Sequence, residues 1–190
     1  MKRGDVQAYT RTSLFLHWMV AILIFAAFPL GVYMHDMPLT PDKLRYFSYH
    51  KWMGVTVFAL AVIRLIWRLT HTPPEMASGL SPWERTAARC VHAILYLLIF
   101  AVPLSGWLMS SATGLQTVWF GVLPIPDLID RDRELGDFLL VVHQTLNWAL
   151  LAFVLGHALA ALNHHFFARD ETLVRMVPLL RSRRTRASKP

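Results

Sequence analysis

Four long apolar stretches constrain the fold of this chain more than any other feature. They cover about residues 14–34, 47–69, 90–111 and 138–167, and each can supply the ~20 residues that a membrane-spanning helix needs. Only 16% of the 190 residues are charged, well below the share of about a quarter in soluble domains. Because a spanning segment must satisfy its own backbone hydrogen bonds, the sequence predicts an all-α integral membrane protein with a four-helix transmembrane bundle.

Basic residues predict the orientation of this bundle. The two connections expected on the outer side, with their helix ends, hold five of the nineteen Lys and Arg residues: Lys43, Arg45, Lys51, Arg131 and Arg133. The other fourteen lie at the other end of the helices, and cytoplasmic ends carry the excess of Lys and Arg. We therefore expect both termini to be cytoplasmic, with residues 1–178 as one domain and 179–190 as a basic, disordered tail against anionic lipid. The formal net charge of +7 then reflects topology and not a nucleic-acid-binding surface.

Local signals predict where the helices begin and end. The first helix is expected to end near Gly31, and Ser81 is placed to cap the third helix. Pro103 and Gly106 are expected to interrupt and bend that helix. The outer connection at 121–137 is expected to hold at most a short turn of helix, because no strand pattern is present.

Histidines interrupt the apolar stretches at two depths. Counted from the cytoplasmic end, His17 and His157 share the inner level, and His50 and His143 share the outer level. His143 and His157 are fourteen residues apart on one helix, which places them ~21 Å apart and only ~40° from the same face. Ionisable residues inside spanning helices are rare and face the bundle interior, so they are functional candidates.

This pattern favours two haem groups over other uses of histidine. Neutral imidazole is a strong axial ligand for haem iron, and Gly54 leaves room for a flat cofactor one turn from His50. A lone membrane histidine often only hydrogen-bonds across helices, and zinc prefers clustered ligands to two separated pairs. The single cysteine, Cys90, leaves no motif for covalent haem attachment and no iron–sulfur cluster.

Several residues keep more than one interpretation. His92 lies at the inner level and could replace His17 as a ligand, while His164 and His165 could be ligands, lie at the lipid headgroups or contact a quinone. Arg64 suits an inner haem propionate as well as a snorkelling role at a helix end. Lys51 and Arg45 are weaker candidates at the outer haem. His35 and His71 are expected to be solvated.

At these residues the chain resembles the bacterial cytochrome b561 family of small inner-membrane dihaem cytochromes. The likeness runs from Tyr9 to Pro178 and includes "LHW", "HKWMG", "VIRLIWR", "PLSGWLM" and "HHFFARDETLVRMVP". The resemblance implies two non-covalent haem b groups, the inner one held by His17 and His157 and the outer one by His50 and His143. It also associates the double histidine with a quinone site, which makes His164 a candidate.

The resemblance implies electron transfer between a periplasmic donor and the quinone pool. Some family members look like superoxide oxidases that reduce ubiquinone, and Arg45 and Lys51 would attract an anionic donor such as superoxide. A second hypothesis is a membrane-anchor, quinone-reactive cytochrome subunit of a larger dehydrogenase or hydrogenase. A third is a non-redox membrane scaffold or transporter with structural histidines.

Overall fold

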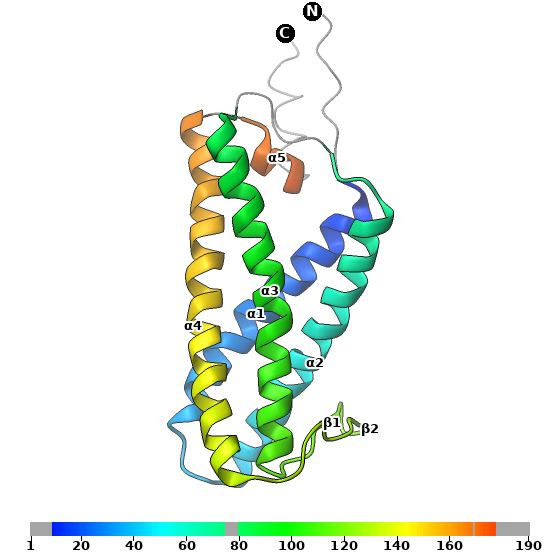
Figure 1. Cartoon of the computed structure of the whole chain (residues 1–190), viewed down its shortest axis with the longest axis vertical. Coiled ribbons are helices and arrows are strands. Elements are labelled where there is room, and N and C mark those ends of the chain that lie inside the picture. Colours follow the sequence, from blue (N-terminus) through cyan, green and yellow to red (C-terminus); the bar gives the residue numbers. More distant parts are fainter. Residues whose placement is uncertain (1–8, 75–79, 169, 178–190) are drawn as a thin grey trace, which may run out of the picture.

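Four long helices form the molecule in the computed structural model, which describes residues 9–74, 80–168 and 170–177. They are α1 (Arg11–His35), α2 (Pro41–Thr70), α3 (Pro82–Ala112) and α4 (Arg133–Asn163). All four are long and apolar enough to cross a membrane. The α-helical class and the four spanning helices of the prediction are confirmed (Figure 1).

Side-chain caps start each of these helices. Thr10, Thr40 and Asp132 accept hydrogen bonds from backbone N–H groups in the first turns of α1, α2 and α4, which satisfies donors that a helix start leaves free. At α3, Ser81 and Glu84 form a reciprocal capping box with Pro82 behind the cap. The predicted role of Ser81 is therefore confirmed.

Three local predictions are wrong. α1 does not end near Gly31 but continues to His35, and α3 is not interrupted at Pro103 and Gly106, where the bend stays a prediction. Packing within the bundle keeps both segments helical, because it overrides the local preferences of glycine and proline. In the outer connection, β1 (Val118–Trp119) and β2 (Leu123–Pro124) pair as a small antiparallel hairpin instead of a helical turn.

The hairpin depends on its turn. Phe120 and Gly121 both have positive φ angles, 51° and 72°, as the tight turn of a two-stranded hairpin requires. The Nε1–H of Trp52 donates to the Val118 carbonyl at 2.6 Å, and that of Trp119 donates to Thr56 Oγ1 at 3.2 Å. These bonds hold the hairpin against α2.

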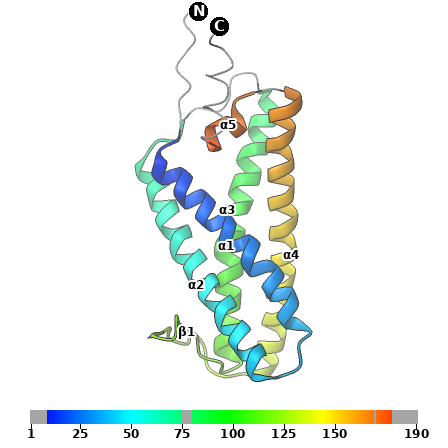
Figure 2. The same cartoon turned by 180° about the vertical axis from the view of Figure 1, so that it is seen from behind.

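The helices pack mainly as two pairs, α1 with α2 and α3 with α4. α1 crosses behind α3 and α4 at a steep angle, as Figures 1 and 2 show from opposite sides. The buried core lies midway along the bundle and is built from small and aliphatic side chains: Ala61, Leu98, Ile99, Val102 and Leu150. This core separates the two histidine levels.

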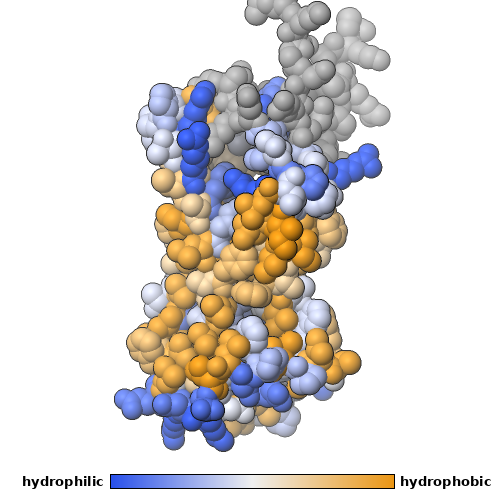
Figure 3. All heavy atoms as spheres, turned by 45° about the vertical axis from the view of Figure 1, so that its right-hand side comes forward, coloured by the Kyte–Doolittle hydropathy of each residue, from blue (hydrophilic) through white to orange (hydrophobic). Residues whose placement is uncertain are grey.

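Apolar side chains also cover the outside of the bundle. Phe15, Leu97 and Phe138 are more than 60% exposed, and Figure 3 shows hydrophobic residues across the middle of the visible face with hydrophilic residues at both ends. A soluble monomer rarely exposes so much apolar surface. The surface therefore fits a bilayer.

A short segment after α4 closes the end of the bundle where α1 begins. It comprises a π-helical turn, η1 (His164–Ala168), and a short helix, α5 (Thr172–Met176). The Nε1–H of Trp18 on α1 donates to the Met176 carbonyl at 2.9 Å, which ties α5 to this end. The predicted basic tail at 179–190 lies outside the described residues.

Candidate functional site

The structure brings the four histidines together as two pairs. The ring centroids of His50 and His143 are 6.2 Å apart with their planes at 87°. Those of His17 and His157 are 6.4 Å apart with their planes at 66°. The first pair joins α2 to α4 and the second joins α1 to α4.

These separations fit two imidazoles that share one metal ion. With metal–nitrogen bonds of ~2 Å and a ring radius of ~1.2 Å, opposing axial imidazoles have centroids about 6.3 Å apart. No group of three or more His, Cys, Asp or Glu side chains that could hold a metal ion occurs in the part of the chain that the structure describes. The candidate ligands are therefore pairs of imidazoles, and a haem iron takes two such protein ligands.

The outer pair is fixed by hydrogen bonds on the nitrogens away from its partner. His50 Nδ1 donates to the Ala27 carbonyl on α1 at 3.0 Å. His143 Nδ1 lies 3.1 Å from the Val102 carbonyl and 3.0 Å from Ser105 Oγ, both on α3. Because a carbonyl only accepts, each Nδ1 carries the proton, and each Nε2 keeps the lone pair that a metal needs.

Two glycines allow this close approach, and sequence reasoning missed their role. A Cβ atom at Gly31 would lie 3.1 Å from His50 Cε1, and one at Gly106 would lie 3.0 Å from His143 Cε1. Each glycine follows a histidine of the inner level by fourteen residues, Gly31 after His17 and Gly106 after His92. The fourteen-residue spacing that linked His143 to His157 could have found them.

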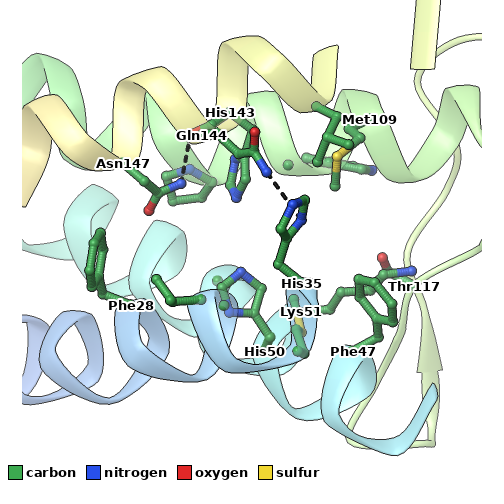
Figure 4. Close-up of a pocket in the computed structure, with 18 of the residues that line it drawn as sticks. Phe28, His35, Phe47, His50, Lys51, Met109, Thr117, His143, Gln144 and Asn147 are labelled. Atoms are coloured by element: carbon green, nitrogen blue, oxygen red, sulfur yellow. Dashed lines mark hydrogen bonds between the residues drawn. The ribbon is translucent and has the colours of Figure 1, made fainter. Parts of the chain in front are cut away.

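A cavity of about 630 Å³ opens between the outer pair, within the range of small-molecule and cofactor sites. Figure 4 shows His50 and His143 on opposite sides of it. Gly54 lines the cavity, and a Cβ there would meet nothing within 4 Å, so the space beside this residue is open.

Polar groups gather at the mouth of this outer cavity. Lys51 lines it and donates from Nζ to the Leu115 carbonyl at 2.6 Å. His35 lines it too, and its Nδ1 accepts from Gln144 Nε2 at 3.2 Å (Figure 4). His35 is exposed, as expected, but it does not lie in a connection: the extended α1 carries its ring over the cavity. Arg45 is exposed and does not line the cavity.

The inner pair has different surroundings. His17 Nδ1 is buried and has no hydrogen-bond partner among the described residues. The guanidinium carbon of Arg64 lies 5.4 Å from the centre of the Tyr96 ring, and that of Arg68 lies 5.5 Å from it.

His92 stands next to this inner pair. Its ring centroid is 5.2 Å from that of His157, which is shorter than the separation that two bonds to one iron require. The geometry therefore favours His17 over His92 as the partner of His157. His92 is left as a neighbour of the site.

His164 forms a pair with Asp170 at the inner end. Its Nδ1 lies 2.7 Å from Asp170 Oδ2, and Asp170 Oδ1 accepts from the Thr172 backbone N–H at 2.8 Å. Partial burial of Asp170 opposes its ionisation, but the bonds from Thr172 and His164 outweigh burial and lower the pKa of Asp170. This pair fixes the orientation of the His164 ring.

Residues 8–179 match the family described as Prokaryotic cytochrome b561. The chain belongs to this family. It is 34% identical over 172 residues to cytochrome b561 homolog 2 of Escherichia coli, covering 90% of this chain and 92% of that protein. It is 30% identical over 181 residues to a probable superoxide oxidase, CybB, of Yersinia pestis, covering 90% and 96% of the two chains. Cytochrome b561 homolog 1 of Escherichia coli is 28% identical over 175 residues, covering 90% and 97%.

Family membership explains the paired imidazoles. This is a multi-pass bacterial membrane cytochrome b that carries b-type haem and takes part in electron transfer, an oxidoreductase function. The residues present fit that group, since free imidazole nitrogens face each other across a cavity lined by apolar side chains and glycine.

Proposed function

We propose that this protein carries single electrons across the bacterial inner membrane through two haem b groups, from a periplasmic donor to the quinone pool. The observation that supports this most strongly is the pair of imidazole separations, 6.2 and 6.4 Å, at two levels of one bundle. Two sites are needed because a single haem would not bridge a ~30 Å hydrocarbon core.

His50 and His143 are the proposed ligands of the outer haem iron, and His17 and His157 those of the inner haem iron. The bound iron supplies the one-electron chemistry, while the protein supplies ligation, burial and charge. The carbonyls of Ala27 and Val102 orient the outer rings. Gly54 leaves space for the outer porphyrin plane.

Two cationic side chains are proposed to bind the haem propionates. Arg64 is the proposed partner at the inner haem, because it packs on Tyr96, one turn from the His92 that lies beside the inner pair. Lys51 lines the outer cavity and serves the outer haem. A cation neutralises a propionate by a charge-assisted hydrogen bond.

Both ends of the chain are proposed to be cytoplasmic. α1 begins, and α5 lies, at the same end of the bundle (Figure 1), and the excess of Lys and Arg marks that end as the inner one. The hairpin and Lys51 then face the periplasm. Residues 1–178 form the single proposed domain, with 179–190 as a cytoplasmic tail.

Superoxide is the proposed donor and ubiquinone the proposed acceptor. A relative at 30% identity is named a probable superoxide oxidase, and Lys51 offers positive charge at the outer cavity to an anionic donor. At the inner end, Asp170 holds His164 by Nδ1, which leaves the His164 Nε2 available to contact a bound quinone.

The test is to purify the haem-replete chain alone and to measure superoxide-driven reduction of ubiquinone in the absence of any other subunit. The reduced-minus-oxidised spectrum is recorded on the same sample. We expect b-type bands and quinone reduction that a His164→Ala variant slows without losing haem. Normal bands with no quinone reduction would indicate a subunit that needs its partner, and absence of b-type bands would reject the redox function.

A further inference from the structure

The two imidazole pairs differ in what holds them. At the outer level, His50 and His143 both donate from Nδ1 to backbone carbonyls. A hydrogen bond from the second ring nitrogen raises the basicity of the ligating nitrogen. A more basic ligand stabilises the more highly charged, oxidised iron. The outer environment therefore lowers the reduction potential of an iron bound there.

The inner level lacks these hydrogen bonds. Within residues 9–74, 80–168 and 170–177, neither His17 nor His157 makes a hydrogen bond from its ring, and His17 Nδ1 is buried without a partner. The inner ligands are therefore less basic than the outer ones. This difference alone raises the inner potential relative to the outer one.

Positive charge near the inner pair also raises the reduction potential of an iron bound there. Arg64 and Arg68 lie one turn apart on α2, both within 5.5 Å of the centre of the Tyr96 ring of α3. In the described part of the chain neither guanidinium is paired with a carboxylate. Tyr96 follows His92 by one turn on α3, and the His92 ring centroid lies 5.2 Å from that of His157, so the two guanidiniums lie beside the inner pair. Positive charge that no protein carboxylate balances stabilises the reduced iron, which carries one more electron.

The outer cavity has cations as well, but they are more nearly balanced. Lys51 and Lys43 line this cavity, and their hydrogen bonds to backbone carbonyls leave their positive charges unchanged. Asp36 lines the same cavity and adds a negative charge. The net positive charge is therefore greater at the inner level.

We propose that Arg64 and Arg68, held against Tyr96, form a charge cluster that sets the inner haem at a higher potential than the outer haem with its carbonyl-bonded ligands. This inference rests on the proposed function. It assigns the charge effect to Arg64 and Arg68, while Tyr96 holds both guanidiniums in place. An electron that enters at the outer site then moves inward. Such a difference in potential would favour the transfer of one electron from the outer group to the inner group, with no bond or proton changing place.

The experiment is an optical redox titration of the purified holoprotein. Two one-electron components are expected. The double variant Arg64→Gln/Arg68→Gln is expected to lower the reduction potential of the higher component by at least ~59 mV, a tenfold change in a one-electron equilibrium. The reduction potential of the lower component should not change. Arg89→Gln is the matched control, because Arg89 is an exposed cation at the inner end of α3 without a contact to Tyr96.

Two further variants assign the components. His50→Ala is expected to remove the outer haem and to leave one component at the higher potential. Ser105→Ala removes a contact of His143 Nδ1 and is expected to raise the reduction potential of the lower component only. The proposal is overturned if the arginine variants move the lower component, both components equally or neither. A haem content other than two per chain would instead overturn the proposed function beneath it.

Discussion

The outer and inner levels of the bundle show two ways to hold a pair of imidazoles. At the outer level, two glycines let the rings reach helix carbonyls, and the rings face a defined cavity. At the inner level, the rings lie among arginines and a third histidine, near the end that α5 closes. The ring separations are almost the same, 6.2 and 6.4 Å. Similar ligand geometry can therefore exist in surroundings that differ in charge and hydrogen bonding.

The largest expected effect comes from removing an outer ligand. His143→Ala and His50→Ala should each remove the outer haem and leave the inner one, because the two sites share no ligand. Pyridine haemochrome assay of the purified variants measures this loss. A stably folded variant that loses both haems, or neither, would contradict the pairing.

Removing His92 should have a much smaller effect than removing His17. The 5.2 Å separation between His92 and His157 is too short for a shared iron, so His92→Ala should keep both haems. His17→Ala should lose the inner one. Haem content and the spectrum of the two variants, side by side, provide the measurement. If His92→Ala loses the inner haem and His17→Ala does not, the inner pairing is wrong.

A smaller effect is expected from crowding an outer ligand. Gly106→Ala places a Cβ 3.0 Å from His143 Cε1, and such overpacking typically costs ~1–3 kcal/mol. The variant should release its outer haem at a lower temperature and retain the inner haem. Leu104→Ala on the same helix is the control, because that side chain is 39% exposed. Equal haem loss in both variants would show that the glycine does not matter.

The smallest effect is expected at the inner end. Asp170→Asn removes a charge-assisted bond to His164 and should cost about 1 kcal/mol near pH 7. Because the pKa of Asp170 is lowered in the folded protein, this stability is present above the ordinary carboxyl pKa and is lost as the pH falls through the lowered value. Thermal unfolding of both proteins at neutral and strongly acidic pH measures it. A difference that grows on acidification would contradict this account.

The sequence predicted the helices and the levels of the histidines because both follow from regular spacing. Apolar length marks a spanning helix, and a fourteen-residue interval places two residues on nearly one face. The family likeness is also readable from short motifs near His17 and His50, and it is confirmed.

Other features depend on contacts between distant segments. Nothing local to Gly31 shows that a ring from α2 packs against it, so it was interpreted as a helix end. The hairpin at 118–124 is too short to show an alternating pattern, and it depends on bonds to Trp52 and Thr56 far away in the chain. His35 gained a place at the cavity only because α1 continues beyond Gly31.

The central claim is that one chain holds two haem b groups, each between two imidazoles. The most direct test is the haem-to-protein ratio of the purified, haem-replete chain, measured together with its reduced spectrum. Two haems per chain are expected, both low-spin with b-type bands. A ratio of one, or a high-spin signal from a haem with a single axial histidine, would contradict it.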